Sequence, residues 1–404
     1  MEASPAGAAF RRTDQSRAAG ASMDTHDFFT PPSVIYGPGA MSCLADEVRG
    51  LGRRALLVIG RGALRRTGTL DAIHSALCRH DIEVVLFEGV ESDPSIETVD
   101  RGAHAAVSGG CDMVVAAGGG SVIDAGKAVA AMVTNSGSVR HYLEGKSFAA
   151  KPIPCVAIPT TSGTGSEVTR NSVLTNRQDG YKRSIRHRWL IPALAIVDPE
   201  LTLSLPPPVT ASTGMDALAQ LIEPYVSRKS TPLTDALAIY GIALVGHSLK
   251  RAVENGGDIQ ARADMSLASL MSGMALANAG LGAAHALSHP LGAHFGIPHG
   301  CSCAMLLPHV MEFNFTAAQE KLARTAAALG EETRGLTAAE AAGRAVARVR
   351  RLAREIGIPA GLSEFGVCEK DLERLAREAH GSSLDANPVE ARDEELVKIL
   401  REAL

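Results

Sequence analysis

Short apolar runs alternate with amphipathic stretches through the first half of the chain. The runs at 55–60 (ALLVIG), 83–90 (EVVLFEGV) and 113–120 (MVVAAGGG) each precede or follow a segment with helical spacing of apolar residues. Two further runs, at 155–161 and 194–201, continue the series. Continuous apolar strands separated by helices are typical of a parallel sheet covered on both faces. The pattern therefore predicts a Rossmann-like, doubly wound α/β domain of the kind that binds nucleotides.

Strand patterning ends at the triple proline 206–208, and the apolar residues beyond it follow only helical periodicity. A chain of 404 residues is long enough for two domains. We therefore expect a dinucleotide-binding α/β domain over 23–205 and an all-helical domain over 206–404. Residues 1–22 carry three arginines and no apolar h-region, so they read as a disordered tail, or as an upstream extension with Met23 as the natural start.

The net charge and the cysteines restrict the kinds of ligand and the cellular compartment that we expect for this protein. A net charge of −4 gives no electrostatic reason to expect nucleic acid or an anionic membrane, and no apolar run approaches the roughly 18–20 residues of a spanning helix. Seven cysteines with no CxxC pair indicate a reducing, cytoplasmic environment. Cys301 and Cys303 are interpreted as packing residues. A small-molecule ligand is the expected partner.

Two glycine-containing loops follow predicted strands. The first, GGGSVIDAGKA, begins at residue 118, and its backbone N–H groups at a helix start suit a pyrophosphate. The predicted cofactor contacts here are Gly118, Gly119, Gly120, Ser121 and Asp124. The alternative reading of the triple glycine is a tight turn without a ligand.

The second loop, PTTSGTGSEVT, begins at residue 159. Thr160, Thr161 and Thr164 can donate hydrogen bonds to phosphate or ribose oxygens at the carboxyl end of a parallel strand. An ordinary helix cap is the alternative, with Ser166 and Glu167 nearby. Two such loops in one sheet favour a dinucleotide.

The helical half carries residues that can bind a metal. Asp216, Gln220 and Glu223 lie at positions i, i+4 and i+7 of a predicted helix, so they share one stripe. The segment HALSHPLGAHFGIPHG places His285 and His289 four residues apart on one helical face. His299 and its Gly/Pro-containing turn can fold back towards them. These residues are candidates for a divalent metal site, and chance proximity is the alternative.

Taken together, these motifs resemble the iron-containing (group III) alcohol dehydrogenase family. They are GGGSVIDAGKA, PTTSGTGSEVT, DPEL, GMDALAQLIEPY and HALSHPLGAHFGIPHG, in that order, and the resemblance extends from about residue 28 to the C-terminus. It implies the dehydroquinate synthase-like fold, in which a cleft between the two domains brings a nicotinamide cofactor to a metal. The implied metal is Fe²⁺, or in some members Zn²⁺, held by one aspartate and three histidines.

Carried onto this sequence, the resemblance assigns metal ligands and a proton relay. The ligands are Asp216, His285 and His299, and the third histidine falls on Gln220. Three outcomes are open: a weaker four-ligand site, a three-ligand site, or a metal-free enzyme, and we favour retained metal. His289 matches a histidine near the substrate that can pass protons near neutral pH.

Further positions concern the cofactor. Lys182 matches a family lysine near the cofactor, and His294 matches no ligand, so we place it at the surface or the rim. Members that prefer NAD tend to carry an aspartate where this chain has Gly60. Without that carboxylate, Arg61 can pair with a 2′-phosphate, so either NAD or NADP is possible.

The implied activity is reversible hydride transfer between the nicotinamide and a small alcohol or aldehyde, in a homodimer or larger homo-oligomer. Two alternatives are an NAD-using lyase of the dehydroquinate synthase kind and a binding homologue whose catalytic site has decayed at Gln220. The particular substrate does not follow from the sequence.

Overall fold

A six-stranded sheet forms the core of the first half of the chain. The structure, a computed structural model, describes residues 25–404, so the tail predicted over 1–22 lies outside the described residues. Neighbouring strands are all parallel, in the order β1-β8-β5-β4-β2-β3. The strands are β1 Ser33–Tyr36, β2 Arg54–Gly60, β3 Glu83–Val90, β4 Met113–Gly118, β5 Cys155–Pro159 and β8 Leu194–Val197. This confirms the predicted doubly wound parallel sheet.

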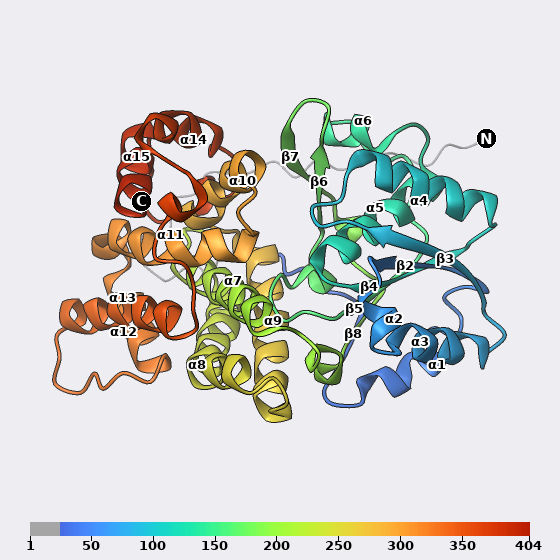
Figure 1. Cartoon of the computed structure of the whole chain (residues 1–404), viewed down its shortest axis with the longest axis horizontal. Coiled ribbons are helices and arrows are strands. Elements are labelled where there is room, and N and C mark those ends of the chain that lie inside the picture. Colours follow the sequence, from blue (N-terminus) through green and yellow to red (C-terminus); the bar gives the residue numbers. More distant parts are fainter. Residues whose placement is uncertain (1–24) are drawn as a thin grey trace, which may run out of the picture.

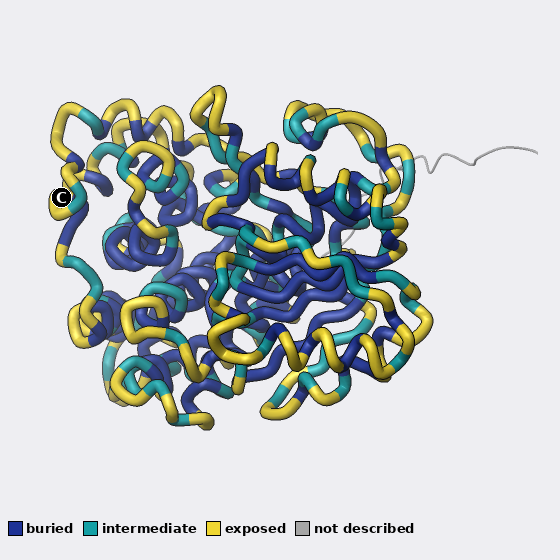
Figure 2. The backbone as a smooth tube through the Cα atoms, turned by 45° about the vertical axis from the view of Figure 1, so that its right-hand side comes forward, coloured by how far each residue is buried: buried dark blue, intermediate teal, exposed yellow. Residues whose placement is uncertain are grey.

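Helices cover both faces of this sheet because its strands are apolar on both sides. In β2, Leu56 and Val58 join one buried cluster, which includes residues of α4 (Ile96–Ser108) and α5 (Gly120–Thr134). The alternate residues Ala55, Leu57 and Ile59 join a second cluster, which includes residues of α1 (Leu44–Glu47) and α3 (Thr69–Cys78). The four inner strands β2, β4, β5 and β8 are accordingly buried almost without interruption (Figure 2), whereas the edge strands β1 and β3 are partly exposed. Full burial of one such aliphatic side chain contributes about 1.5–3 kcal/mol.

A β-hairpin that the sequence pattern did not predict stands beside the sheet. It pairs β6 (Asn171–Asn176) with β7 (Tyr181–Arg186) in antiparallel register and reaches towards the helical half (Figure 1). Its buried side chains alternate, but two of the three in β6 are the polar Ser172 and Asn176, which hides the strand period. The hairpin carries Lys182 to the boundary between the halves.

The second half is helical, and Figure 1 shows it beside the sheet half. Its first helix, α7, begins at the second residue of the triple proline, because proline is well suited to the first turn of a helix. Its helices are α7 Pro207–Val226, α8 Pro232–Glu254, α9 Ile259–Ala279, α10 Ala283–Phe295, α11 His299–Phe313, α12 Phe315–Ala328, α13 Ala338–Glu355, α14 Leu372–Glu378 and α15 Asp393–Glu402; two short helices, α2 Ala63–Arg66 and α6 Val139–Leu143, belong to the sheet half.

One helix, α8, is long and apolar enough by length and composition to cross a membrane, although no such run was expected. The bent pair α9 and α10 passes the same test as a broken span. Both tests are also passed by core helices. In α8, Ala238, Ile242, Val245 and Leu249 are fully buried in the main cluster of the helical half.

The backbones of the two halves come very close together at Gly165 and Gly273. Gly165, in the loop after β5, lies against Gly273 in α9, and a Cβ built on Gly165 would sit 2.4 Å from the Gly273 Cα. Gly165 also has a φ of +58°, a conformation that glycine adopts easily. Any side chain at this contact would force the loop and the helix apart.

Candidate functional site

The two glycine-containing loops lie against each other at the carboxyl end of the sheet. The Thr160 N–H donates to the Gly118 carbonyl at 2.9 Å, and a Cβ on Gly119 would lie 3.4 Å from the Thr161 Cγ2. A Cβ on Gly120 would come within 2.4 Å of the Thr164 Oγ1. At the first turn of α5, the Val122 and Ile123 N–H groups donate to the Gly119 carbonyl. The N–H groups of Gly120 and Ser121 make no hydrogen bond within the described residues and are free to bind a ligand.

Ser121 and Asp124 make protein contacts beside this turn. The Ser121 hydroxyl accepts from the Asp93 N–H at 3.1 Å. The Asp124 carboxylate lies 2.9 Å from the buried Lys127 Nζ and accepts from the Val173 N–H at 3.0 Å. Ser166 also donates to Asp124. Asp124 thus joins α5 to the second loop and the hairpin, which favours a positioning role for its carboxylate.

Four potential ligand atoms converge in the helical half. Asp216 on α7, His285 on α10, and His299 and Cys303 on α11 each offer an atom, and these atoms lie within 4.8 Å of one another. The Asp216 Oδ1 lies 3.4 Å from the His285 Nε2 and 3.6 Å from the His299 Nε2. Among the described residues, the buried Asp216 Oδ1 and His285 Nε2 have no hydrogen-bond partner. Buried atoms of this kind fit a cation between them.

Neighbouring groups fix which nitrogen each ligand histidine presents. The His285 Nδ1 lies 2.6 Å from the Glu223 carboxylate, to which it donates, so Nε2 faces Asp216. Ser288 donates to the His285 carbonyl at 2.8 Å, and its oxygen is 3.1 Å from the His299 Nδ1. The His299 Nδ1–H therefore donates to Ser288, and Nε2 again faces Asp216. Outer contacts of this kind orient metal-binding imidazoles.

The ionisable side chains of this cluster shift one another's pKa values. Burial opposes ionisation of Asp216, but His299 and His285 lower the pKa of its carboxyl below the usual value. Burial also opposes the charged form of His285, yet Cys303 and Glu223 raise its pKa well above the usual value. The Cys303 pKa is lowered to about 7, because the two imidazoles outweigh the effect of burial. A group of anions that draws protons onto imidazoles is a suitable setting for a divalent cation.

Gln220 and Cys303 differ in their position around the cluster. The Gln220 Oε1 accepts from the Ser272 hydroxyl at 3.0 Å. Cys303 lies one helical turn after His299, with its Sγ 3.8 Å from the His299 Nε2. Both Cys301 and Cys303 pack in apolar clusters, as interpreted, but Cys303 also belongs to the group of potential metal ligands.

His289 and Lys182 lie together near this cluster. The ring centroids of His289 and His299 are 5.9 Å apart. The pKa of His289 is lowered well below its usual value, first by burial and then by the positive charges of His299 and Lys182. Lys182 pairs with Asp93 at 2.5 Å. His294, expected at the surface or the rim, is partly exposed and pairs with Glu378 at 2.5 Å.

One pocket of about 950 Å³ joins the two sets of residues. It is lined from both halves of the chain, including the start of α5, the hairpin and α10. Of the predicted site residues, those that line it are Gly120, Ser121, Asp124, Thr164, Lys182, Gln220, His285, His289 and His299. Asp216 lies behind this lining at 2% exposure. The structure thus brings part of the predicted cofactor set and most of the predicted metal set to one cavity, while Gly118, Gly119, Thr160 and Thr161 are not among its lining residues.

Gly60 and Arg61 lie farther along the carboxyl edge of the sheet, outside the lining of this pocket. Gly60 ends β2, and a Cβ there would lie 3.4 Å from Val122 in α5. Arg61 is exposed, and within 25–404 it forms no ion pair. Arg65, in the short helix α2 that follows, is instead paired with Glu88 at 2.7 Å.

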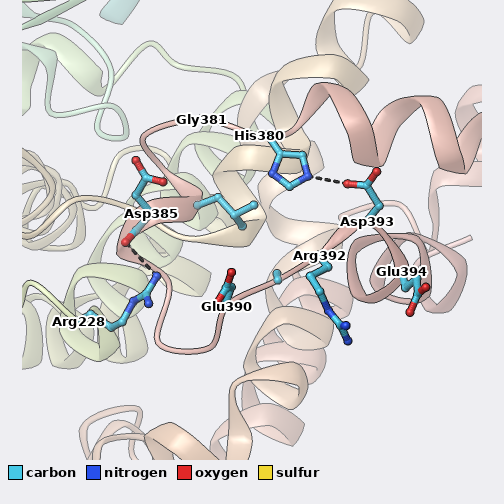
Figure 3. Close-up of a pocket in the computed structure, with 10 residues that line it drawn as sticks. Arg228, His380, Gly381, Asp385, Glu390, Arg392, Asp393 and Glu394 are labelled. Carbon is cyan, nitrogen blue, oxygen red and sulfur yellow. Dashed lines mark hydrogen bonds and ion pairs between the residues drawn. The ribbon is translucent and has the colours of Figure 1, made fainter.

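A second pocket, of about 720 Å³, contains none of the predicted site residues. It lies between the end of α7 and the segment joining α14 to α15 (Figure 3). Two contacts join its polar groups: Arg228 donates to the Asp385 carbonyl at 3.1 Å, and His380 pairs with Asp393 at 2.6 Å. Its chemistry therefore gives no reason to place the reaction there.

Two protein-family models match this chain. The model of the family described as iron-containing alcohol dehydrogenase matches residues 31–199, and the model of its C-terminal part matches residues 210–404. The chain belongs to the iron-containing alcohol dehydrogenase family. Membership confirms the resemblance inferred from the motifs, the fold, and the predicted class of enzyme, an oxidoreductase of the alcohol dehydrogenase type.

Relatives within this family resemble the chain over nearly its whole length. A 1,3-propanediol dehydrogenase of Citrobacter freundii is 39% identical over 380 residues, which cover 93% of this chain and 98% of that protein. An NAD-dependent methanol dehydrogenase of Bacillus methanolicus is 37% identical over 94% of this chain and 100% of its own length. A crystal structure of a 1,3-propanediol oxidoreductase superimposes with a TM-score of 0.92 at 39% identity, over 94% of this chain and all of that one.

Proposed function

We propose that the protein catalyses reversible hydride transfer between a nicotinamide cofactor and a small alcohol or aldehyde, with a divalent metal at the Asp216 cluster. The observation that carries this proposal is the single pocket lined both by the start of α5 and by the imidazoles of His285 and His299. Hydride transfer requires cofactor and substrate carbon in direct contact. A cavity shared by the two sets of residues meets that requirement.

The cofactor phosphates belong at the glycine turn before α5. The Gly120 and Ser121 N–H groups at this turn have no partner within the described residues, and Thr161 and Thr164 bring hydroxyls to the same place. Gly60 has no carboxylate that would repel a phosphate on the 2′ position of the ribose. The Arg61 guanidinium forms no ion pair within the described residues and can bind such a phosphate. We therefore propose NADP(H) as a cofactor alongside NAD(H).

Asp216, His285 and His299 would hold the metal. When bound, a divalent ion supplies a Lewis acid that withdraws electron density from the substrate oxygen. Imidazole and carboxylate donors suit Fe²⁺, the metal we expect first, and also Zn²⁺. Glu223 and Ser288 keep both Nε2 atoms turned towards Asp216, so little reorganisation accompanies metal binding.

His289 is proposed to move the proton that alcohol oxidation releases. Its buried Nδ1 has no hydrogen-bond partner within the described residues, and its low pKa keeps the imidazole neutral. A neutral imidazole can accept a proton, and Lys182 beside it repels the charged form, which favours onward transfer.

The remaining proposals concern the whole protein. We propose the division into domains at 23–205 and 206–404, and assembly into a homodimer or larger homo-oligomer. A reducing, cytoplasmic setting is also proposed, since all seven cysteines are free thiols. The names of the relatives favour alcohol substrates over the lyase reaction considered for this fold.

The test is turnover by the metal-loaded protein. Anaerobically purified protein is loaded with Fe²⁺ or Zn²⁺ and supplied with NADH or NADPH and a panel of small aldehydes; the reverse reaction uses methanol, 1,3-propanediol and longer alkanols. We expect cofactor oxidation that disappears on chelation. A protein that holds metal and cofactor but turns over none of these substrates would overturn the proposal.

A further inference from the structure

The metal cluster contains a thiol, and its geometry is that of a ligand. The Cys303 Sγ lies 3.8 Å from the His299 Nε2, and it shares the 4.8 Å cluster with Asp216 and His285. Around a tetrahedral Zn²⁺, ligand atoms at ordinary bond lengths lie about 3.3–3.5 Å from each other. The three measured separations in the cluster, 3.4, 3.6 and 3.8 Å, are close to these values before any ion draws the atoms together.

Helix geometry brings this thiol into place. His299 is the first residue of α11, and Cys303 follows it by four residues, so both side chains lie on the same face of the helix. Cys303 is completely buried and belongs to the group of potential ligands, whereas Cys301 on the same helix packs with Leu287 and Leu306 and does not. A metal bound by His299 would therefore meet Cys303 without movement of the backbone.

Gln220 is engaged elsewhere. Its amide oxygen accepts from the Ser272 hydroxyl at 3.0 Å and is therefore turned to Ser272. An amide oxygen is in any case a weak ligand for Fe²⁺ or Zn²⁺ compared with an imidazole or a thiolate.

From this geometry we infer that Cys303 is the fourth protein ligand, in place of the histidine absent at position 220. Metal binding replaces the thiol proton, which leaves to solvent, with a metal–sulfur bond. The inference rests on the proposed metal site.

The position of Cys303 leaves the pocket side of the metal open. Gln220, His285 and His299 line the pocket, but Cys303 and Asp216 do not, so the thiolate approaches from behind. Substrate can then approach from the pocket. A thiolate in place of an imidazole also shifts the preference of the site towards the softer Zn²⁺.

Cobalt substitution tests the inference without relying on turnover. Co²⁺ bound by a thiolate shows an intense sulfur-to-metal charge-transfer band in the near ultraviolet, which carboxylate and imidazole ligands do not produce. We expect this band in the Co²⁺ form of the unaltered protein and of Cys301→Ala, and its loss in Cys303→Ala. Metal affinity should fall by at least about 10- to 100-fold in Cys303→Ala and remain unchanged in Cys301→Ala.

The outcomes separate the two proposals. Protein that binds Co²⁺ without the band overturns the role of Cys303 but leaves the proposed function intact, whereas protein that binds no metal contradicts the proposed metal site. Because Cys303→Ala removes a buried group, the double variant Gln220→His with Cys303→Ala provides a second measure. Recovery of metal affinity in that variant supports the exchange of ligands, and equal affinity in Cys303→Ala and the unaltered protein overturns it.

Discussion

The Glu223 carboxylate accepts the Nδ1 proton of His285 at 2.6 Å and so decides which ring nitrogen faces Asp216. The same carboxylate accepts the N–H groups of Gly282 and Ala284 at the start of α10. One side chain thus orients a ligand and holds the helix that carries it.

Replacing Glu223 with Gln should weaken metal binding by about 10- to 100-fold, because the amide no longer enforces the His285 tautomer. Metal titration of the folded variant measures the effect. Asp393→Asn is the matched control, since it alters an exposed His–carboxylate contact of the same 2.6 Å length. Equal metal affinity in Glu223→Gln and the unaltered protein would contradict the orienting role.

Gly120→Ala should impair cofactor binding, because the added methyl would lie 2.4 Å from the Thr164 Oγ1 and displace the loop. Overpacking typically costs about 1–3 kcal/mol, so we expect the Kd for NADH or NADPH to rise about tenfold or more. Fluorescence titration of the bound cofactor provides the measurement.

The control for Gly120→Ala is Gly343→Ala in α13, where an added Cβ has no neighbour within 4 Å. That variant should bind cofactor normally. If Gly120→Ala binds as tightly as Gly343→Ala, the phosphates do not lie at this turn.

Arg61→Ala should raise the KM for NADPH about tenfold and leave the KM for NADH unchanged, because a charge-assisted hydrogen bond to the 2′-phosphate contributes about 1.5–3 kcal/mol. Initial rates with each cofactor provide the comparison. Arg65→Ala serves as the control, since Glu88 already neutralises that guanidinium. A parallel loss with both cofactors would place Arg61 away from the ribose.

Acid should remove a stabilising contribution from Glu91. Burial opposes its ionisation, but hydrogen bonds from Ser95 and Thr98 at the start of α4 lower its pKa from 4.5 to about 2. The folded pKa lies below the unfolded one, so this contribution is complete above pH 4.5 and is lost as the pH falls towards 2. The shift corresponds to about 2–3 kcal/mol at neutral pH.

Urea unfolding of Glu91→Gln measures this contribution. At pH 7 the variant should be less stable than the unaltered protein, and the difference should shrink steadily below pH 4.5. The exposed Glu97 in the first turn of the same helix offers the control substitution Glu97→Gln. A stability difference that is the same at pH 7 and at acid pH would refute the assignment.

Much of the arrangement was predictable because its local signals agree. The strands are apolar on both faces, and the stripe of Asp216, Gln220 and Glu223 lies on one helix, as its spacing indicated. The sequence predicted a Gly/Pro-containing turn at His299, whereas His299 is the first residue of α11. That difference concealed the four-residue spacing that brings a cysteine to the cluster.

Other contacts depend on tertiary structure. The hairpin of β6 and β7 buries polar side chains whose partners come from α5 and the adjoining loop, so its period carried no local signal. The hydrogen bond between Ser288 and His299 likewise arises only when α10 and α11 pack together. Sequence spacing alone indicates neither contact.

The contact between Gly165 and Gly273 limits which substitutions can change the substrate range of this protein. The loop of the sheet half and helix α9 approach so closely that only hydrogen atoms separate their backbones. The width of the reaction cavity therefore depends on the absence of side chains at Gly165 and Gly273. Substrate range can change through residues that line the cavity, but adding a single methyl group at this contact would alter the spacing between cofactor and metal for every substrate at once.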